Sequence, residues 1–398
     1  MKNIYSFILG HSPELSFLEI KSVLEFENID FSIVYSNEKF VLLEMDEDLD
    51  ISYFSNILGG IIKIGKVDFF INKLKDIENI KNTFVELIEK KCDITHKIKF
   101  GFSLYDKDKE LKFFIEKLGM TIKKSLKEKN ISSRVIISKE DQLSSVIVKK
   151  EHMIESGFDM QVLKSDDKIY FSKTLSVQDF ERFNALDYDR PKVDSVSGMM
   201  PPKLAKIMLN LSSSRGIVLD PFCGSGTILI LAGELNFKKI IGSDISEKAI
   251  SDSTENLKWY EERFDKKLNY YVFKADIKDL IKEGVEENSI DSIVTEGYLG
   301  KPIKGNETED FIKNQIKELE KLYLDSFDIF AKVLKQGVSV IISMPVYHTK
   351  SEDLHLEILS DIEKIGFEIK PLSESSKTLI YKRDDQKVYR EIVKLIKK

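Results

Sequence analysis

The stretch Asp220-Pro-Phe-Cys-Gly-Ser-Gly-Thr227 constrains the fold more than any other part of this chain. It lies between an apolar run at 216–219, which predicts a short buried strand, and residues 228–234, which predict a helix. Two glycines one residue apart allow a strand-to-helix turn to bring its backbone against a ligand. Leu229 breaks the dinucleotide fingerprint, and no Lys-Ser/Thr follows the glycines as in a phosphate-binding loop. The turn therefore predicts a ligand site without the usual phosphate pattern, or else an ordinary turn of an α/β domain.

The chain after this turn alternates apolar strand patterns with amphipathic helix patterns. This alternation predicts a doubly wound α/β domain that ends in an antiparallel C-terminal hairpin. A proline-led helix at 201–211 precedes the first strand. Strands are expected at 217–219, 239–243, 270–274, 290–294, 338–342, 367–370 and 378–381, and helices at 226–235, 247–262, 309–334 and 353–365.

Four of the predicted strands are followed by acidic residues, which are Asp220, Asp244, Asp276 and Glu296. Ligands of doubly wound sheets bind outside the carboxyl ends of the strands, where these residues would gather. Asp244 can accept ribose hydroxyls, because Ser246 is an equally good helix cap, and Asp276 can accept an adenine amino group while Ile277 covers the ring. Such an acidic site suits a cationic nucleoside without phosphate. We therefore expect S-adenosylmethionine (SAM) as the cofactor and a class I methyltransferase sheet.

Composition excludes several other classes of protein. The net charge is −6, so no global basic character marks a nucleic-acid partner, although 61 Lys and Arg residues can still form a local basic face. The two cysteines, Cys92 and Cys223, fall in different predicted domains, which favours a reducing cytoplasm over a disulfide framework. Five scattered histidines argue against a metal site built by the protein. We expect no signal peptide and no membrane span.

The first 176 residues predict two α+β modules. Residues 1–70 read as β-α-β-β-α-β, the order of a ferredoxin-like module, although an unspecific small α+β domain fits equally well. Residues 71–176 form a second α+β unit, in which the amphipathic helix at 111–129 is rich in lysine. Its lysines are suited to RNA phosphates or are simply a solvated helix face. Residues 177–199 have no strong period and are expected to be a linker.

The segment Thr295-Glu-Gly-Tyr-Leu-Gly300 resembles the motif of amino-methyltransferases that follows the fourth strand, where Thr-Asp-Pro-Pro-Tyr-Gly is usual. Glu296 matches the acidic position, Gly297 and Tyr298 replace the prolines, and Leu299 replaces the aromatic residue. The resemblance implies that Glu296 and the carbonyl of Gly297 orient an exocyclic amine and that Tyr298 stacks on the base. Proline rigidifies such a loop and lacks an N–H, so Gly297 is expected to add flexibility and a free donor.

Four further stretches, 5–16, Gln178-Asp179, Asp189-Arg-Pro191 and Met200-Pro-Pro-Lys-Leu-Ala205, resemble the THUMP-domain tRNA guanosine-N2 methyltransferases, and 381–383 and 386–391 resemble that family's ending. The resemblance implies an N-terminal ferredoxin-like domain (1–70), a THUMP RNA-binding domain (71–176) and a SAM-dependent catalytic domain (200–398). It also implies methylation at N2 of a tRNA guanosine, guanosine 10 in the family, and a cytoplasmic location. A small activating subunit is a further partner that the family suggests.

The resulting site prediction has three parts and no metal. Catalysis is assigned to Glu296, Gly297 and Tyr298. The cofactor is assigned to Asp220, Phe222, Cys223, Gly224, Ser225, Gly226, Thr227, Asp244, Ile245, Asp276, Ile277 and Glu296. RNA contacts are assigned to Lys117, Lys123, Lys124, Arg134 and Arg190. Two alternatives remain open, a SAM- and RNA-binding homologue with impaired catalysis and an amino-methyltransferase that acts on another base or substrate.

Overall fold

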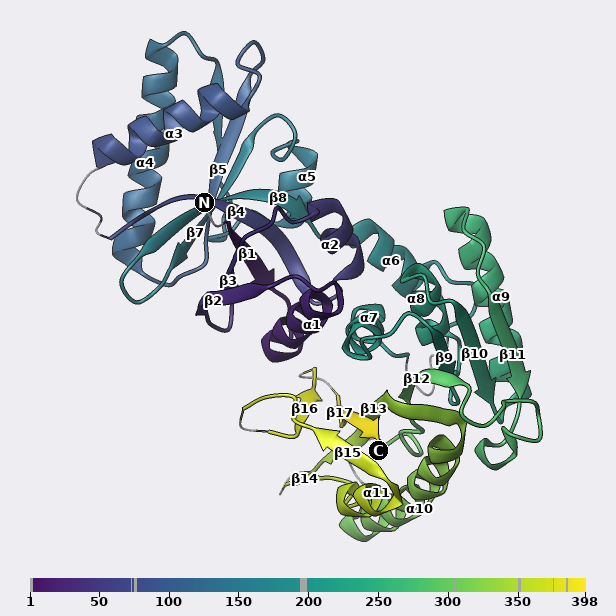
Figure 1. The fold of residues 1–398 in the computed structure, drawn as a ribbon. Helices are drawn as coiled ribbons and strands as arrows, with labels where there is room; N and C mark the ends of the chain where they lie inside the picture. Colours follow the sequence, from purple (N-terminus) through teal and green to yellow (C-terminus); the bar gives the residue numbers. More distant parts are fainter. Residues whose placement is uncertain are drawn as a thin grey trace. The chain divides into compact units, whose positions relative to one another are not determined.

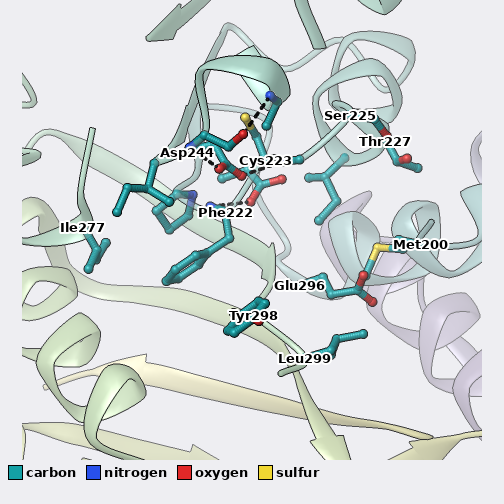
Figure 2. A pocket seen from close by; sticks show the side chains of 18 of the residues that line it. Met200, Phe222, Cys223, Ser225, Thr227, Asp244, Ile277, Glu296, Tyr298 and Leu299 are labelled. Carbon is teal, nitrogen blue, oxygen red and sulfur yellow. Dashed lines mark hydrogen bonds between the residues drawn. The ribbon is translucent and has the colours of Figure 1, made fainter. Parts of the chain in front are cut away.

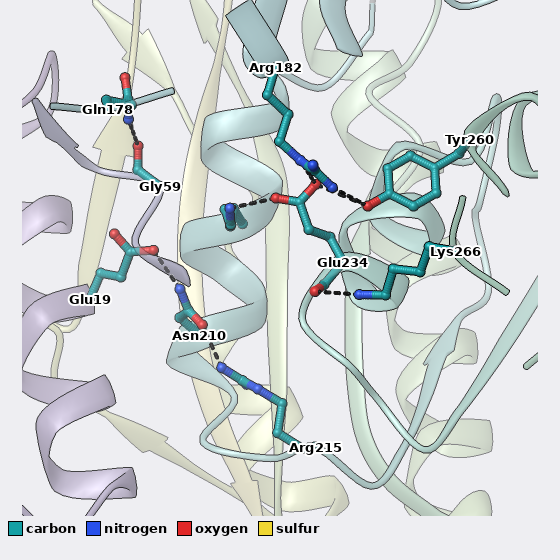
Figure 3. Close-up of polar contacts among 10 residues, drawn as sticks. Glu19, Gly59, Gln178, Arg182, Asn210, Arg215, Glu234, Tyr260 and Lys266 are labelled. Atoms are coloured by element: carbon teal, nitrogen blue, oxygen red, sulfur yellow. Dashed lines mark hydrogen bonds and ion pairs between the residues drawn. The ribbon is translucent and has the colours of Figure 1, made fainter. Parts of the chain in front are cut away.

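The computed structural model describes residues 3–72, 74, 77–193, 199–303, 305, 307–349, 352–374, 376–383 and 386–398. The chain divides into two compact units (Figure 1). The N-terminal unit comprises residues 1–13 and 28–180, and the C-terminal unit comprises residues 14–27 and 181–398. Helix α1 (Pro13–Phe26) therefore groups almost entirely with the C-terminal unit, although it was predicted as part of the first domain. Its Glu19 is fully buried and accepts a hydrogen bond from Asn210 at 2.6 Å (Figure 3).

The N-terminal unit is built on one eight-stranded sheet with the order β2-β3-β1-β4-β8-β7-β5-β6. The first four strands in sequence pair only in antiparallel fashion with one another. Strand β4 also pairs antiparallel with β8, so the two predicted modules share a sheet. The elements of the first module are β1 (Asn3–Leu9), β2 (Phe31–Ser36), β3 (Phe40–Met45), α2 (Ile51–Ile57) and β4 (Ile61–Ile71).

Helices α3 and α4 cover the second half of this sheet (Figure 1). Apolar side chains recur on one side of each helix and pack against the strands, with Phe84 and Leu118 fully buried. Asp108 caps α4 by accepting hydrogen bonds from the backbone N–H groups of Glu110 and Leu111. The elements are α3 (Ile77–Lys91), β5 (Ile98–Leu104), α4 (Lys109–Glu128), β6 (Ser133–Ile136), α5 (Ser145–Lys150), β7 (Phe158–Lys164) and β8 (Ile169–Val177).

The C-terminal unit carries the doubly wound sheet that the sequence predicts. Strands β11-β10-β9-β12-β13 are parallel, and β17 lies antiparallel between β13 and β15. The strands are β9 (Ile217–Asp220), β10 (Lys239–Asp244), β11 (Tyr270–Lys274), β12 (Ile290–Glu296), β13 (Leu334–His348), β14 (Asp353–Leu354), β15 (Phe367–Lys370), β16 (Thr378–Tyr381) and β17 (Val388–Lys397). The helices are α7 (Pro202–Leu211), α8 (Thr227–Glu234), α9 (Glu247–Phe264), η1 (Ile277–Asp279), α10 (Glu309–Val333) and α11 (Leu359–Ile365).

Both faces of this sheet are buried. Leu219, Ile241 and Ile293 belong to one cluster with the apolar side of α10 and with α11. Their neighbours Val218, Ile240 and Val294 are also buried, and successive side chains of a strand point to opposite faces. Continuous apolar strands therefore follow from helices on both sides, as is usual for parallel sheets.

Three predictions for this region need correction. The predicted linker at 177–199 contains the helix α6 (Phe180–Tyr188), whose Arg182 forms an ion pair with Glu234 at 2.9 Å and donates to the hydroxyl of Tyr260 (Figure 3). Strands β15 and β16 do not form a hairpin with each other, because each pairs with the unpredicted strand β17. Helix α11 begins at Leu359 rather than 353, where β14 precedes it. Within the described ranges, no helix is long and apolar enough to cross a membrane.

Candidate active site

A pocket of about 510 Å³ lies at the carboxyl ends of β9, β10 and β12 in the C-terminal unit. In Figure 2, Asp244, Cys223 and Ser225 lie on one side of it, and Glu296, Tyr298 and Leu299 lie on the other, with Phe222 between them. The predicted residues Asp220, Phe222, Cys223, Gly224, Ser225, Thr227, Asp244, Ile245, Asp276, Ile277, Glu296, Gly297 and Tyr298 all line this pocket. Met199, Met200, Lys248, Asp252 and Leu322 line it too and were not predicted.

The glycine turn is shaped by two residues with positive φ. Gly224 has φ +49° and faces open space, so the backbone is accessible to a ligand there. Gly226 has φ +85° and precedes α8, and a Cβ at this position would lie 3.0 Å from the Cβ of Ser253. Cys223 is buried, its N–H donates to the carbonyl of Ser243, and burial raises the pKa of its thiol well above the usual value. A buried thiol with a raised pKa is poorly suited to act as a nucleophile.

Asp220 is the most deeply buried carboxylate of the pocket, with 2 % of its surface exposed. Its Oδ1 accepts hydrogen bonds from the hydroxyl of Thr295 at 2.6 Å and from the N–H of Phe222 at 3.2 Å. Burial raises the pKa of Asp220 to about 7, because the two hydrogen bonds only partly offset desolvation. The floor of the pocket therefore holds a carboxyl group that a cationic ligand would help to ionise.

The raised pKa of Asp220 predicts a pH-dependent stability of the ligand-free protein. The native state keeps this proton to about pH 7, whereas the unfolded chain releases it near pH 4, so the free energy of unfolding falls as the pH rises between these values. Asp220→Asn keeps an oxygen acceptor and removes this loss, which is at most about 4 kcal/mol. We expect the variant's melting temperature to rise relative to wild type between pH 5 and pH 8. The expectation would be contradicted if the difference in melting temperature between variant and wild type did not change with pH. It would also be contradicted if Asp328→Asn, which alters an exposed carboxylate, gave an equal change.

Asp244 and Asp276 are held at the next two strand ends. Asp244 accepts hydrogen bonds from the N–H groups of Gly224 at 3.1 Å and Ser246 at 2.8 Å, so it fixes the glycine turn as well as facing the pocket. Ser246 caps α9 through its own hydroxyl, as the sequence suggested. Asp276 accepts one hydrogen bond from the N–H of Lys278 through Oδ1. Each carboxylate oxygen can accept more than one hydrogen bond, so both groups still offer acceptors to a ligand.

Glu296 ends β12 and is paired with an arginine that the sequence analysis missed. Nε of Arg390, on β17, donates to Oε1 of Glu296 at 2.6 Å, and the arginine is almost fully buried. The ion pair fixes the position of one carboxylate oxygen. Arg390 lies within the C-terminal stretch that resembles the family's ending, but sequence alone gave no signal that it reaches Glu296.

The loop after Glu296 is held by side chains rather than by prolines. The N–H of Gly297 donates to the carbonyl of Ser343 at 3.1 Å, so the expectation of a free donor is wrong. The hydroxyl of Tyr323 donates to the carbonyl of Tyr298 at 3.3 Å. A Cβ at position 297 would lie 2.2 Å from this hydroxyl, which requires glycine here. Tyr323 comes from α10, whose apolar period gave no hint of this role.

The far end of the loop has a second anchor. The hydroxyl of Tyr347 donates to the carbonyl of Leu299 at 2.8 Å and accepts a hydrogen bond from Gln315 at 2.7 Å. Both side chains are buried, so these bonds persist without competition from water. Tyr298, in contrast, is 48 % exposed and projects from a held backbone. Its ring is therefore available to a planar partner.

The predicted RNA contacts have different outcomes. Lys117, Lys123, Lys124 and Arg134 belong to the N-terminal unit and are exposed, on α4 and the edge strand β6. Arg190 is only 4 % exposed and donates to the hydroxyl of Thr227 within the C-terminal unit. The assignment of Arg190 to RNA is therefore corrected, because its guanidinium faces inward. Within the described ranges, no group of acidic, histidine or cysteine side chains could hold a metal ion.

The pocket fits the expected nucleoside cofactor. Its volume lies in the range of pockets that enclose a drug-sized ligand. Asp244 and Asp276 offer acceptors for hydroxyl and amino groups, Ile277 and Phe222 offer apolar surface, and the four carboxylates suit a cation. The open backbone at Gly224 allows close approach. The glycine turn after β9 is therefore better suited to bind a cationic nucleoside than a phosphate group.

Comparisons with known proteins agree with this geometry. The family described as methyltransferase domain matches residues 212–398, and that described as DNA methylase matches residues 64–255. The tRNA (guanine(10)-N2)-dimethyltransferase of Methanothermobacter thermautotrophicus is 26% identical over 360 residues, covering 88% of this chain and 89% of the relative. A Methanothermococcus thermolithotrophicus protein, named Probable tRNA (guanine(10)-N2)-dimethyltransferase, is 35% identical over 143 residues, 33% of this chain and 81% of the relative.

A solved structure shows the same fold over the whole length. TrmN from Thermus thermophilus aligns with a TM-score of 0.56 at 15% identity, covering 99% of this chain and 100% of that chain. At this identity the match supports the architecture alone, with the Rossmann-like sheet of methyltransferases in the C-terminal unit. The relatives found by sequence show the family: the chain belongs to the tRNA (guanine(10)-N2)-dimethyltransferase family.

Proposed function

We propose that this protein transfers methyl groups from SAM to the exocyclic N2 of a guanosine in tRNA, at position 10. The observation that carries the proposal is the juxtaposition in one pocket of four strand-end carboxylates with the anchored loop 297–300. The relatives are named dimethyltransferases, so we propose that the same guanosine receives two methyl groups.

The reacting amine has to be oriented, because its lone pair is delocalised into the guanine ring. Oε1 of Glu296 is engaged by Arg390, which leaves Oε2 to accept one N2–H. The carbonyl of Gly297 would accept the second N–H. These two acceptors favour a pyramidal nitrogen whose lone pair faces the methyl donor. Glu296 is also placed to take up the proton that the nitrogen loses.

The base has to leave its stack to reach this pocket, at a cost of a few kcal/mol. Tyr298, with its exposed ring beside Glu296, would recover part of that cost by stacking on the guanine. The anchors from Tyr323 and Tyr347 hold the backbone on either side of that ring. We propose that these tyrosines supply the rigidity that two prolines give to the usual motif.

Several residues would hold the cofactor. Asp244 would accept the ribose hydroxyls, Asp276 the adenine amino group, and Ile277 would cover the ring. The turn 222–227 would pass beneath the methionine portion, with Asp220 at the floor of the pocket. SAM supplies an electrophilic methyl group when bound, so the protein needs no covalent nucleophile.

The N-terminal unit would position the tRNA. The strand order β2-β3-β1-β4, antiparallel throughout, supports a ferredoxin-like domain, and we propose a THUMP domain for the second half of that sheet. The exposed lysines of α4 and Arg134 would contact RNA phosphates, which makes binding sensitive to salt. A cytoplasmic location and a small activating subunit remain predictions.

The direct test is methyl transfer from labelled SAM to unmodified tRNA transcripts, followed by nucleoside mass spectrometry. We expect N2-methylated guanosine at position 10, and a transcript with adenosine at that position should remain unlabelled. Binding of SAM and tRNA without any methylated nucleoside would instead favour a homologue with impaired catalysis. A label on another base would favour an amino-methyltransferase of different specificity.

Arg390 provides a test of how Glu296 is oriented. Arg390→Met removes the donor to Oε1, so the carboxylate can rotate away from the amine. We expect kcat to fall about tenfold to 100-fold, with the affinity for SAM nearly unchanged. Arg390→Lys, which keeps the charge, should recover part of the loss. Full activity of Arg390→Met in single-turnover assays would show that Glu296 is oriented without it.

A further inference from the structure

Arg190 is a buried charge that has no anionic hydrogen-bond partner among the residues described by the structure. It lies just after α6, and only 4 % of its surface is exposed. Its guanidinium donates to the hydroxyl of Thr227 at 2.8 Å and contacts Sδ of Met199 at 3.2 Å. Nε has no hydrogen-bond partner among the described residues. A guanidinium stays charged at physiological pH, and buried charges are normally paired, so this arrangement calls for an anion.

Asp187 is the carboxylate that attracts Arg190, but it interacts with other cations as well. It also attracts Arg383 and Lys203, so three cations face one carboxylate. No ion pair joins Asp187 to Arg190 within the part of the chain that the structure describes. Arg383 and Lys203 are exposed and can be screened by water, whereas Arg190 cannot. The positive charge of Arg190 is therefore only partly neutralised by Asp187.

Arg190 lies behind the part of the pocket lining that is formed by Thr227 and Met199. The rest of the lining includes the carboxylates Asp220, Asp244 and Glu296, which would repel an anion. Among the described lining residues the one lysine is Lys248, and it is paired with Asp252. The amino-acid end of SAM carries a carboxylate, so one part of the lining has to favour negative charge.

We propose that Arg190 supplies this charge from behind the lining, and that the hydroxyl of Thr227, which Arg190 contacts, binds the α-carboxylate of the methionine portion of the cofactor. The hydroxyl of Thr227 accepts from Arg190, which leaves its own proton to be donated into the pocket. The first turn of α8, which begins at Thr227, adds N–H groups that also favour an anion. This inference rests on the proposed use of SAM and adds a residue to its site.

Calorimetric titration with three ligands tests the assignment on the full chain. SAM carries the carboxylate, decarboxylated SAM keeps the sulfonium and the amine without it, and 5′-methylthioadenosine lacks the whole side chain. For Arg190→Met we expect the affinity for SAM to fall at least tenfold, with less than a threefold change for the other two ligands. Thr227→Val should show the same selectivity, and Arg263→Met, an exposed arginine of α9, should change none of the three affinities.

The outcomes separate this inference from the proposed function. An equal loss of affinity for SAM and decarboxylated SAM in both Arg190→Met and Thr227→Val would overturn it, because the role would then be structural. Unchanged SAM affinity in both variants would overturn it as well. SAM binding without methyl transfer to tRNA would defeat the proposed function alone and leave this test intact.

Discussion

Glu296→Gln is expected to lower kcat for tRNA methylation roughly 10³-fold, within the range for loss of a positioned acid–base group. Oε1 of the glutamine can still accept from Arg390, which places the amide NH₂ where Oε2 of Glu296 lies in the native protein. Two donors, the amide and the guanine amine, would then face each other. The amine loses both its orientation and its proton acceptor, while the backbone of the loop stays anchored by Tyr323 and Tyr347.

The measurement is single-turnover methyl transfer with saturating SAM and tRNA. Glu287→Gln, which alters an exposed carboxylate of the same unit, is the matched control and should keep wild-type kcat. Combining Glu296→Gln with Arg390→Met should cost little beyond Glu296→Gln alone, because both changes act on one group. Additive losses in the double variant would show that Arg390 acts independently of Glu296. Retention of more than a tenth of wild-type kcat in Glu296→Gln would rule out the proposed role.

The strands and helices of the catalytic sheet were predictable because each follows a strong local period. Parallel strands buried on both faces read as apolar runs, and Val218 and Leu219 show why, since one packs on each side. Strand β17 was missed because Arg390 and Glu391 interrupt its apolar pattern with two buried charges. Both are accommodated by partners distant in sequence, Glu296 for one and His355 and Thr378 for the other. Such a strand has no local signature.

The site residues also fall into two groups, those that the sequence pattern predicts and those whose role depends on contacts between distant elements. Residues at strand ends, such as Asp244 and Asp276, were found because topology alone gathers them at one edge of the sheet. Tyr323 and Gln315 were not found, because their contacts depend on how α10 packs over the loop. Arg190 was misassigned to RNA for a similar reason. Its charge suggests a surface, and only its burial against Thr227 shows otherwise.

The largest expected effect on stability concerns a buried ion pair in the N-terminal unit. Nζ of Lys63, on β4, lies 2.6 Å from Oδ2 of Asp159, on β7, and both side chains are essentially inaccessible to solvent. Hydroxyl groups complete the arrangement, since Ser103 donates to Oδ1 of Asp159 and Thr174 to Oδ2. The group links four strands, β4, β5, β7 and β8, where the two halves of the sheet meet.

Lys63→Met is expected to lower the free energy of unfolding of this unit by about 3–5 kcal/mol, because it leaves Asp159 buried without its cation. The same substitution in an exposed pair, Lys364→Met beside Asp361, should cost less than about 1 kcal/mol. Urea unfolding followed by circular dichroism measures both. Lys63→Met combined with Asp159→Leu should be more stable than Lys63→Met alone, since the unpaired charge is gone. A double variant that is no more stable would mean that the destabilisation comes from the loss of the lysine's packing and not from the stranded carboxylate.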